Sequence, residues 1–212
     1  MFYKMSNYII DNYLCKDETL TQEQREVIEF GIVRILEDIP KYLALFIIGL
    51  YFKLLPLLAI VLVVTMVYKT FVGGAHARTN LICFFSSTSI FLAPVIIAKY
   101  INFSNLAIGC LFLLALITSV YVIIKIAPAD TEEVPILNKE KRKRMKIFAM
   151  IVFILLMALS VYFLKNVIIT KIILLTIISI NLLATNTAYK IYKCKHSYES
   201  EEFKEYFTNN YF

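Results

Sequence analysis

The sequence has few of the residues from which metal sites and phosphate-binding loops are built. Its 212 residues include only two histidines, four cysteines and five glycines. His76 and His196 are too far apart for the ligand spacings of zinc sites, and no glycine-rich phosphate loop is present. We therefore expect no metal and no other cofactor, and we expect no nucleic-acid partner.

Charge is absent from long stretches of the chain. The sequence is 59% hydrophobic and its mean hydropathy is +0.71, whereas soluble domains are usually about half apolar. The last four of six apolar segments approach the ~20 residues that cross a bilayer, and the first two are short enough to form a hairpin. The segments are 41–55, 56–70, 81–99, 104–126, 146–164 and 167–188. This pattern predicts an all-α, polytopic integral membrane protein.

The N-terminal region lacks the apolar run of a signal peptide, because charged residues interrupt it. Residues 2–15 have the spacing of an amphipathic helix. A second helix is expected after Thr21, which forms a capping-box pattern with Gln24, and we expect it to end at Pro40. Both helices are predicted to be polar or interfacial elements with a structural role.

The distribution of charge predicts the orientation of the chain in a bacterial cell membrane. With both termini in the cytoplasm, 18 of the 22 Lys and Arg residues fall on the cytoplasmic side, as the positive-inside rule requires. The acidic residues also fall there, so no carboxylate lies in a spanning helix, which argues against an ion or proton pathway. We expect one domain over 1–212, with interfacial helices over 1–39, a transmembrane bundle over 40–188 and a cytoplasmic tail over 189–212.

The stretch from Gly73 to Ser87 combines a histidine and a cysteine seven residues apart. On a continuous helix His76 and Cys83 are separated by roughly 10 Å, beyond the ~3 Å reach of a proton transfer. The glycine pair that begins this stretch allows a loop to fold back, and Thr79 is a suitable N-cap for a helix that follows. Cys83 then lies in the first turn, where the helix macrodipole favours a thiolate.

Two alternatives to this pair remain open at this point. The pair can be completed across a dimer, or Cys83 is a buried structural cysteine near a loop histidine. At the inner membrane face Cys83 is expected to be a free thiol. The other cysteines are weaker candidates for a catalytic role. Cys110 is expected to be a small core residue, and Cys15 is expected to pack on the N-terminal helix. Cys194 and His196 are two residues apart and would point to different sides of a helix.

The longest polar loop, residues 127–146, ends in a dense basic run. Its ordinary explanation is attraction to anionic membrane lipids and control of topology. The alternative is a docking site for an acidic peptide, formed by Lys141, Arg142, Lys143 and Arg144. In the last apolar segment, Asn181 and Thr185 share a helix face, which favours a hydrogen bond between helices.

Several of these motifs together resemble the accessory gene regulator B family. They are Gly73-Gly-Ala-His-Ala-Arg-Thr79 followed by Cys83 and Ser87, then Ala127-Pro-Ala129 with Pro135-Ile136 before the basic run. The length and the hydrophobic layout agree, so the similarity covers nearly the whole chain. The resemblance implies a bacterial membrane cysteine endopeptidase that processes a D-type pro-peptide into a cyclic quorum-sensing signal, and it implies a homodimer.

The resemblance also assigns roles to residues. Carried over, Cys83 is the nucleophile and His76 the general base. From their positions beside this pair, the helix-start amides after Thr79 are candidate oxyanion donors, and Asn80 and Ser87 are candidates for assisting groups. The segment 130–133 departs from some members, which have lysines after the Ala-Pro-Ala motif. The competing class is a non-enzymatic peptide exporter or transporter subunit, against which stand the missing membrane carboxylates and the placement of the histidine and cysteine at one face.

Overall fold

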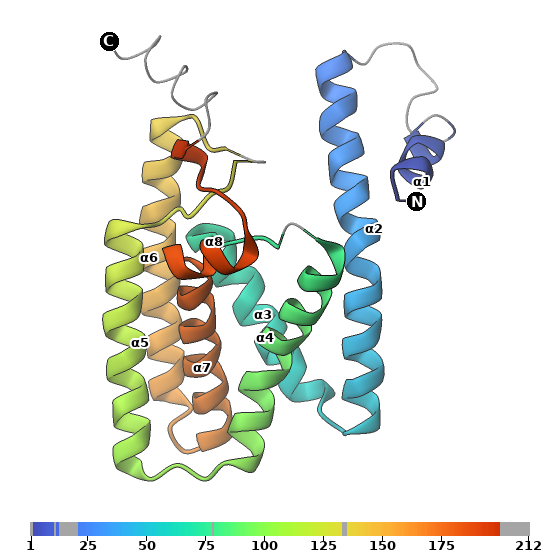
Figure 1. Ribbon diagram of the computed structural model, residues 1–212. Helices are drawn as coiled ribbons and strands as arrows, with labels where there is room; N and C mark the ends of the chain where they lie inside the picture. The colour runs from blue at the N-terminus through green and yellow to red at the C-terminus, as the bar shows by residue number, and fades with distance from the viewer. Residues whose placement is uncertain (1, 11, 13–20, 78, 133–134, 200–212) are drawn as a thin grey trace. The chain divides into compact units, whose positions relative to one another are not determined.

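The computed structural model of the protein describes residues 2–10, 12, 21–77, 79–132 and 135–199 (Figure 1). Every regular element in these ranges is a helix, so the predicted all-α class is confirmed. The chain forms two compact units, Met1–Phe52 and Lys53–Phe212, and each is described by itself.

The first unit contains the two helices that were expected near the N-terminus. Helix α1 spans Phe2–Ile9 and α2 spans Gln22–Tyr51. The two helices pack together, and the Ser6 hydroxyl of α1 donates a hydrogen bond to the Glu29 carbonyl of α2 over 3.3 Å. Cys15, which was predicted to pack on the N-terminal helix, lies outside the described residues.

Helix α2 is longer than predicted, because it continues through Pro40. A proline inside a helix removes one backbone hydrogen bond, which is why we expected the helix to end there. The prediction of a separate apolar helix over 41–55 was therefore wrong, and most of that segment is the second half of α2. Two ion pairs with three-residue spacing lie near the proline: Arg34–Glu37 precedes it, and Asp38–Lys41 spans it.

The second unit is a helical bundle organised around α7. Its helices are α3 (Leu55–Val72), α4 (Asn80–Tyr100), α5 (Asn105–Lys125), α6 (Lys139–Tyr162), α7 (Val167–Leu183) and α8 (Asn186–Tyr192), followed by the 3-10 turn η2 (Ser197–Glu199). Helix α7 packs against α3, α4, α5 and α6, and ten of its 17 residues are buried. It therefore forms the centre of the hydrophobic core.

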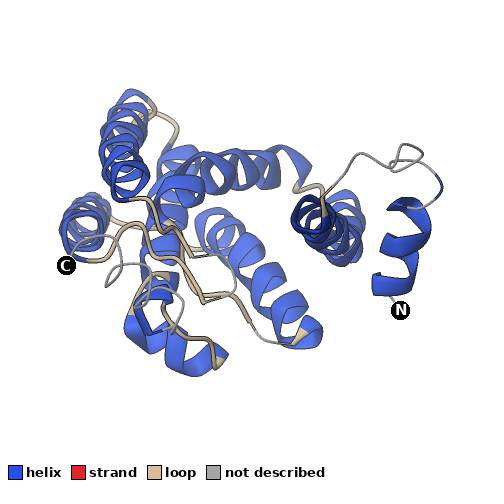
Figure 2. Cartoon of the chain, turned by 90° about the horizontal axis from the view of Figure 1, so that it is seen from above, coloured by secondary structure: helices blue, strands red, loops and turns tan. Residues whose placement is uncertain are grey.

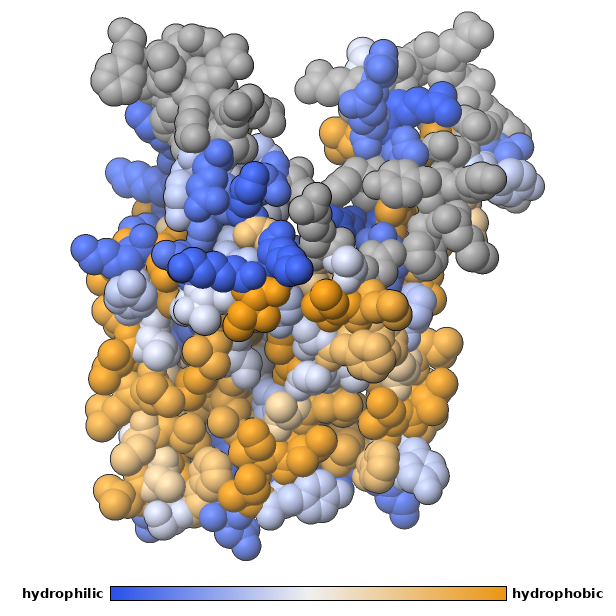
Figure 3. All heavy atoms as spheres, viewed as in Figure 1, coloured by the Kyte–Doolittle hydropathy of each residue, from blue (hydrophilic) through white to orange (hydrophobic). Residues whose placement is uncertain are grey.

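The helices of this unit have the length and apolarity of membrane spans. Among the described residues, four helices meet both conditions: α3, α4 from Leu81 onward, α5 and α6. The α7–α8 pair is bent by 70° and makes a fifth if it counts as one broken span. Apolar side chains cover much of the visible helix surface, while polar ones gather near the end where α6 begins (Figure 3). The protein is therefore membrane-embedded.

Polar side chains link the helices of the bundle in its interior. The Asn181 amide group donates a hydrogen bond to the Ser119 hydroxyl over 2.8 Å and accepts one from the Tyr68 hydroxyl over 3.0 Å. The predicted role of Asn181 in joining helices is confirmed. Thr185 does not share its helix face, because α7 ends at Leu183 and Thr185 caps α8 instead.

Candidate active site

Helix α3 ends at a glycine pair whose backbone conformation few other residues adopt. Gly73 has a φ of 80° and Gly74 a φ of 141°. A Cβ atom at Gly73 would lie 2.3 Å from the carbonyl oxygen of Ala129, so a side chain has no room there. Glycine therefore allows the chain to leave α3 and cross the end of the bundle, where the α5–α6 and α7–α8 connections also lie (Figure 2).

The loop that follows is held by backbone hydrogen bonds to two other segments. The Gly74 N–H donates to the Ala129 carbonyl, and the Ala129 N–H donates to the Val72 carbonyl, each over 2.8 Å. The Ala75 N–H donates to the carbonyl of Leu183, at the end of α7, over 2.8 Å. The backbone is thus fixed on both sides directly before His76.

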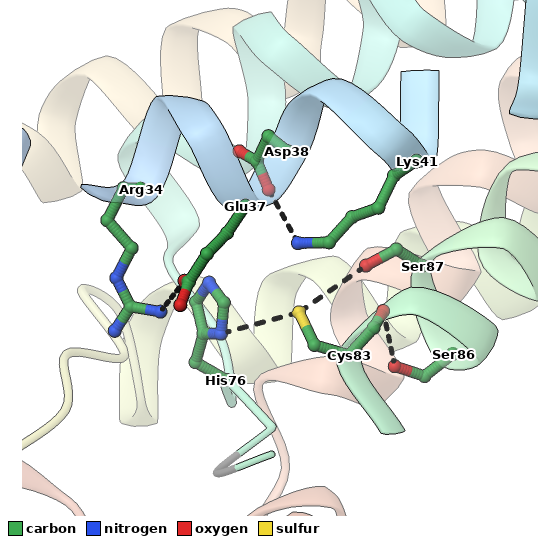
Figure 4. A network of polar contacts seen from close by, with 8 residues as sticks. All are labelled: Arg34, Glu37, Asp38, Lys41, His76, Cys83, Ser86 and Ser87. Atoms are coloured by element: carbon green, nitrogen blue, oxygen red, sulfur yellow. Dashed lines mark hydrogen bonds and ion pairs between the residues drawn. The ribbon is translucent and has the colours of Figure 1, made fainter. Parts of the chain in front are cut away.

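The fixed loop brings His76 to Cys83. The His76 Nδ1 atom lies 3.8 Å from the Cys83 Sγ atom, within hydrogen-bonding range for sulfur (Figure 4). Cys83 lies in the first turn of α4, and the residue is only 7% exposed. The sequence predicted this fold-back, and the structure shows it within one chain, without an unbroken helix through the region and without a second copy.

The residues proposed as assisting groups lie at the start of α4. Ser87, one turn beyond Cys83, places its hydroxyl 3.9 Å from the sulfur, and the Ser86 hydroxyl donates to the Cys83 carbonyl over 3.2 Å (Figure 4). Thr79 is the N-cap residue, as predicted, although its side chain makes no capping hydrogen bond in the described structure. The Asn80 side chain lies outside the described residues.

The four basic candidates on the long loop do not have equivalent surroundings. Lys141, Lys143 and Arg144 are exposed on the first turns of α6. Arg142 instead turns toward the preceding loop, where its guanidinium lies 2.6 Å from the Asp130 carboxylate and also donates to the Ile136 carbonyl. Three of the four are therefore available at the surface, and Arg142 is engaged in the structure.

Asp130 is a residue whose importance the sequence did not reveal. It appeared only as part of a segment that departs from the family pattern. In the structure its side chain is 5% exposed, and its carboxylate accepts hydrogen bonds from Arg142 and from the Ile136 N–H. The sequence signal for this pair is weak: Asp130 lies in the loop before α6, and Arg142 lies twelve residues later in the first turns of that helix.

The remaining cysteines and the second histidine have other surroundings. Cys110 is exposed on α5, so the prediction that it is a core residue was wrong. The Cys194 thiol faces the carbonyl of Tyr189, while the His196 ring stacks on Tyr189 and its Nε2 lies 2.9 Å from the Asn186 side-chain oxygen. In the described ranges, no group of three or more His, Cys, Asp or Glu side chains is placed to hold a metal ion.

Comparison with known proteins gives a consistent result. The sequence profile of a family described as accessory gene regulator B matches residues 3–185. An AgrB-like protein of Clostridium perfringens (strain SM101 / Type A) is 24% identical over 178 residues, 80% of this chain and 83% of the relative. The accessory gene regulator protein B of Staphylococcus intermedius is 36% identical over 93 residues, 43% of this chain and 46% of the relative. No solved structure matches the chain.

Proposed function

Because the chain belongs to the accessory gene regulator B family, we propose that it is a membrane cysteine endopeptidase that cuts a D-type pro-peptide. Membership itself links the chain to the processing of quorum-sensing peptides. The observation that best supports a cysteine peptidase is the distance of 3.8 Å between His76 Nδ1 and Cys83 Sγ at the start of α4.

The first chemical step is nucleophilic attack by the cysteine. His76 Nδ1 takes the proton of the Cys83 thiol, and the thiolate attacks the carbonyl carbon at the C-terminal end of the future signal. The observed separation is longer than a tight catalytic hydrogen bond, as is common before substrate binds. Attack converts the carbonyl into a tetrahedral oxyanion.

The helix start supplies donors for that oxyanion. The first N–H groups of an α-helix have no acceptor within the helix, and those after Thr79 are on the same first turn as Cys83. When the intermediate collapses, the C–N bond breaks and the leaving amine takes the proton from the His76 imidazolium. The signal segment then remains on Cys83 as a thioester.

The second step closes the ring. A thiol or hydroxyl side chain of the bound peptide attacks the thioester carbonyl, and the Cys83 thiolate leaves and regains a proton. Exchange of one thioester for another is close to neutral in free energy, so water must be kept from the thioester until the ring has closed. A site at the membrane surface, with the pro-peptide lying in the interface, provides such exclusion.

The proposal includes an orientation and an assembly. We infer that both termini and the Cys83 site face the cytoplasm, that the exposed lysines of α6 contact anionic lipid or the peptide, and that the protein is a homodimer. The orientation is supported by the 18 Lys and Arg residues on that side. A membrane-impermeant maleimide is expected to label Cys83 in inside-out vesicles only, and labelling of intact cells would contradict the orientation.

The decisive experiment traps the thioester. The protein is purified into lipid nanodiscs, mixed with a D-type pro-peptide that it cleaves, quenched in acid and analysed by mass spectrometry after digestion. We expect the signal segment attached to Cys83 through a bond that hydroxylamine breaks, and no adduct in Cys83→Ala. Cleavage by the Cys83→Ala protein at the wild-type rate would refute the proposal.

The same variants separate the peptidase from the exporter. In cells that co-express the pro-peptide, a peptidase leaves the precursor intact when Cys83 or His76 is replaced. An exporter or transporter subunit would instead leave normally cut signal trapped in the cytoplasm. The absence of carboxylates from the predicted spans favours the peptidase.

A further inference from the structure

We propose that Asp130 is a positioning residue that fixes the loop carrying His76, and that its pairing with Arg142 gives it this role. The inference rests on the proposed function, because the geometry that it protects is the approach of His76 Nδ1 to Cys83 Sγ. Asp130 acts through the backbone and does not contact the reacting atoms.

Asp130 ties its loop to two helices. Its carboxylate Oδ2 accepts a hydrogen bond from Arg142 Nη1 on α6 over 2.6 Å and from the Ile136 N–H over 2.9 Å. Its backbone carbonyl accepts a hydrogen bond from the Tyr189 hydroxyl on α8 over 3.0 Å. The position of Asp130 is therefore fixed through both its side chain and its backbone.

The neighbouring residue Ala129 transmits this constraint to the loop that carries His76. Its N–H donates to the Val72 carbonyl and its own carbonyl accepts from the Gly74 N–H, each over 2.8 Å. The two backbones are so close that a Cβ at Gly73 would lie 2.3 Å from the Ala129 oxygen. Because Gly74 is two residues before His76, a displacement of Ala129 displaces the imidazole.

Packing alone does not hold this junction. A cavity of about 460 Å³ lies beside it, and its lining includes Pro128, Ala129, Asp130, Arg142 and His196. On that side the loop borders open space, whereas protein interiors are normally close-packed. The hydrogen bonds of Asp130 therefore restrain the loop from this direction, together with the backbone contacts of Thr131 with His196 and of Glu132 with Lys195.

A second ion pair on the same helix offers a matched control. Arg144 lies 3.5 Å from Glu140, and their side chains are 74% and 81% exposed. Exposed pairs contribute little to stability, whereas removal of one partner from a buried pair leaves an uncompensated charge. The Asp130 side chain is 5% exposed. Loss of the carboxylate charge at Asp130 should therefore matter where its loss at Glu140 does not.

The test uses a protein in which Cys83 is the only cysteine, with Cys15, Cys110 and Cys194 changed to serine, in lipid nanodiscs. Two quantities are measured: the rate of Cys83 alkylation by iodoacetamide, and kcat and KM for cleavage of the pro-peptide. We expect Asp130→Asn to slow alkylation and to lower kcat by about 10- to 100-fold, the cost of a misplaced catalytic group. KM should stay within about twofold, because ground-state binding is intact. Glu140→Gln should match the wild type.

Variants of Arg142 test the pairing itself. Arg142→Gln should lower kcat as Asp130→Asn does. The double variant should lose much less than the two single losses combined, because each single variant already removes the shared Asp130–Arg142 pair. Arg142→Gln also removes the bonds of Arg142 to the Ile136 and Pro128 carbonyls. Arg142→Lys, which keeps the charge, should restore most of kcat. Wild-type kcat and alkylation in Asp130→Asn would overturn the inference, as would faster alkylation, which reports an unfolded loop. If Asp130→Asn is not recovered folded, Arg142→Gln against Arg142→Lys decides.

The failure of this inference is distinguishable from failure of the proposed function. If Cys83→Ala still cleaves the pro-peptide, the peptidase assignment fails, and the alkylation rates still report on the positioning role. If Cys83→Ala is inactive while Asp130→Asn equals the wild type in both measurements, only the positioning role is refuted.

Discussion

The chain has two histidines, and each has a cysteine nearby in the sequence, but their surroundings differ. His76 and Cys83 are seven residues apart, and their nitrogen and sulfur atoms lie 3.8 Å from each other. Cys194 and His196 are two residues apart and have separate partners: the thiol faces the Tyr189 carbonyl, and the imidazole lies 2.9 Å from the Asn186 oxygen.

The comparison shows that backbone geometry matters more than sequence distance for such a pair. His196 stacks on Tyr189 with a centroid distance of 3.6 Å and on Tyr198 with 4.9 Å, and it is 6% exposed. Its ring is therefore a packing element. His76 lies on the loop after α3, which Gly73 and Gly74 allow to turn toward α4. Its Nδ1 atom faces the Cys83 sulfur. One histidine packs among aromatic rings, and the other faces the sulfur from which we propose that it accepts a proton.

Replacing the two cysteines should give the largest difference in activity between the His76–Cys83 and Cys194–His196 pairs. We expect Cys83→Ala to lower cleavage of the pro-peptide by about 10⁴-fold or more, the loss typical for removal of a nucleophile. Cys194→Ala should cleave within about twofold of the wild type, since its thiol faces the Tyr189 carbonyl and has no part in the proposed reaction. Cleavage is measured on purified protein in nanodiscs. Equal rates for the two variants would contradict the catalytic role proposed for Cys83.

Replacing the two histidines should give the next largest effect. His76→Asn removes the proposed general base and is expected to lower kcat by about 10²- to 10⁴-fold. His196→Asn loses ring stacking and should affect stability more than kcat. The check is kcat together with a thermal melt for each variant. A full loss of kcat in folded His196→Asn would show that the second histidine takes part in catalysis.

Much of the His76–Cys83 site was predictable, because its elements are local. The glycine pair, the N-cap residue Thr79 and the first turn of the following helix are all signals within one stretch of chain, and together they predicted the fold-back. The role of Asp130 was not predictable in this way. Its partners lie on α6 and α8, and such contacts depend on tertiary packing.

The fold was predictable in class and less so at individual boundaries. Apolar runs separated by polar loops identified α3, α4, α5 and α6. Pro40 misled the prediction because a long helix can continue through a proline at the cost of one backbone hydrogen bond. Cys110 misled it because an apolar helix in a membrane protein exposes apolar residues to lipid instead of burying them.

Adding a methyl group at Gly73 tests the loop geometry that brings His76 to Cys83. Gly73→Ala should lower cleavage about tenfold or more, because the left-handed backbone is strained and the new Cβ meets the Ala129 oxygen at 2.3 Å, which shifts the His76 loop. The matched control is Gly109→Ala on α5, where nothing lies within 4 Å and helix propensity improves by up to about 1 kcal/mol. Wild-type cleavage by Gly73→Ala would contradict the role given to the loop.

The smallest effect expected concerns the pH dependence that His196 gives to stability. Burial lowers the pKa of His196 and outweighs the charges of Glu199 and Asp130, which raise it. The unfolded chain, in which His196 has its ordinary pKa near 6.5, therefore binds more protons than the folded chain below that pH. Stability from the neutral ring is complete above pH ~6.5 and declines as the pH falls.

His196→Phe keeps the stacking on Tyr189 and Tyr198 but has no proton to bind. Melting temperatures of both proteins are compared in nanodiscs between about pH 7.5 and 5.5, and the wild type should lose a few degrees more than the variant over this range. All other titrating groups, including Tyr189, Tyr198, Glu199 and Asp130, are present in both proteins, so the difference reports on His196. Parallel pH curves would mean that the ring is not held neutral by its burial, and the contrast with His76 would then rest on contacts alone.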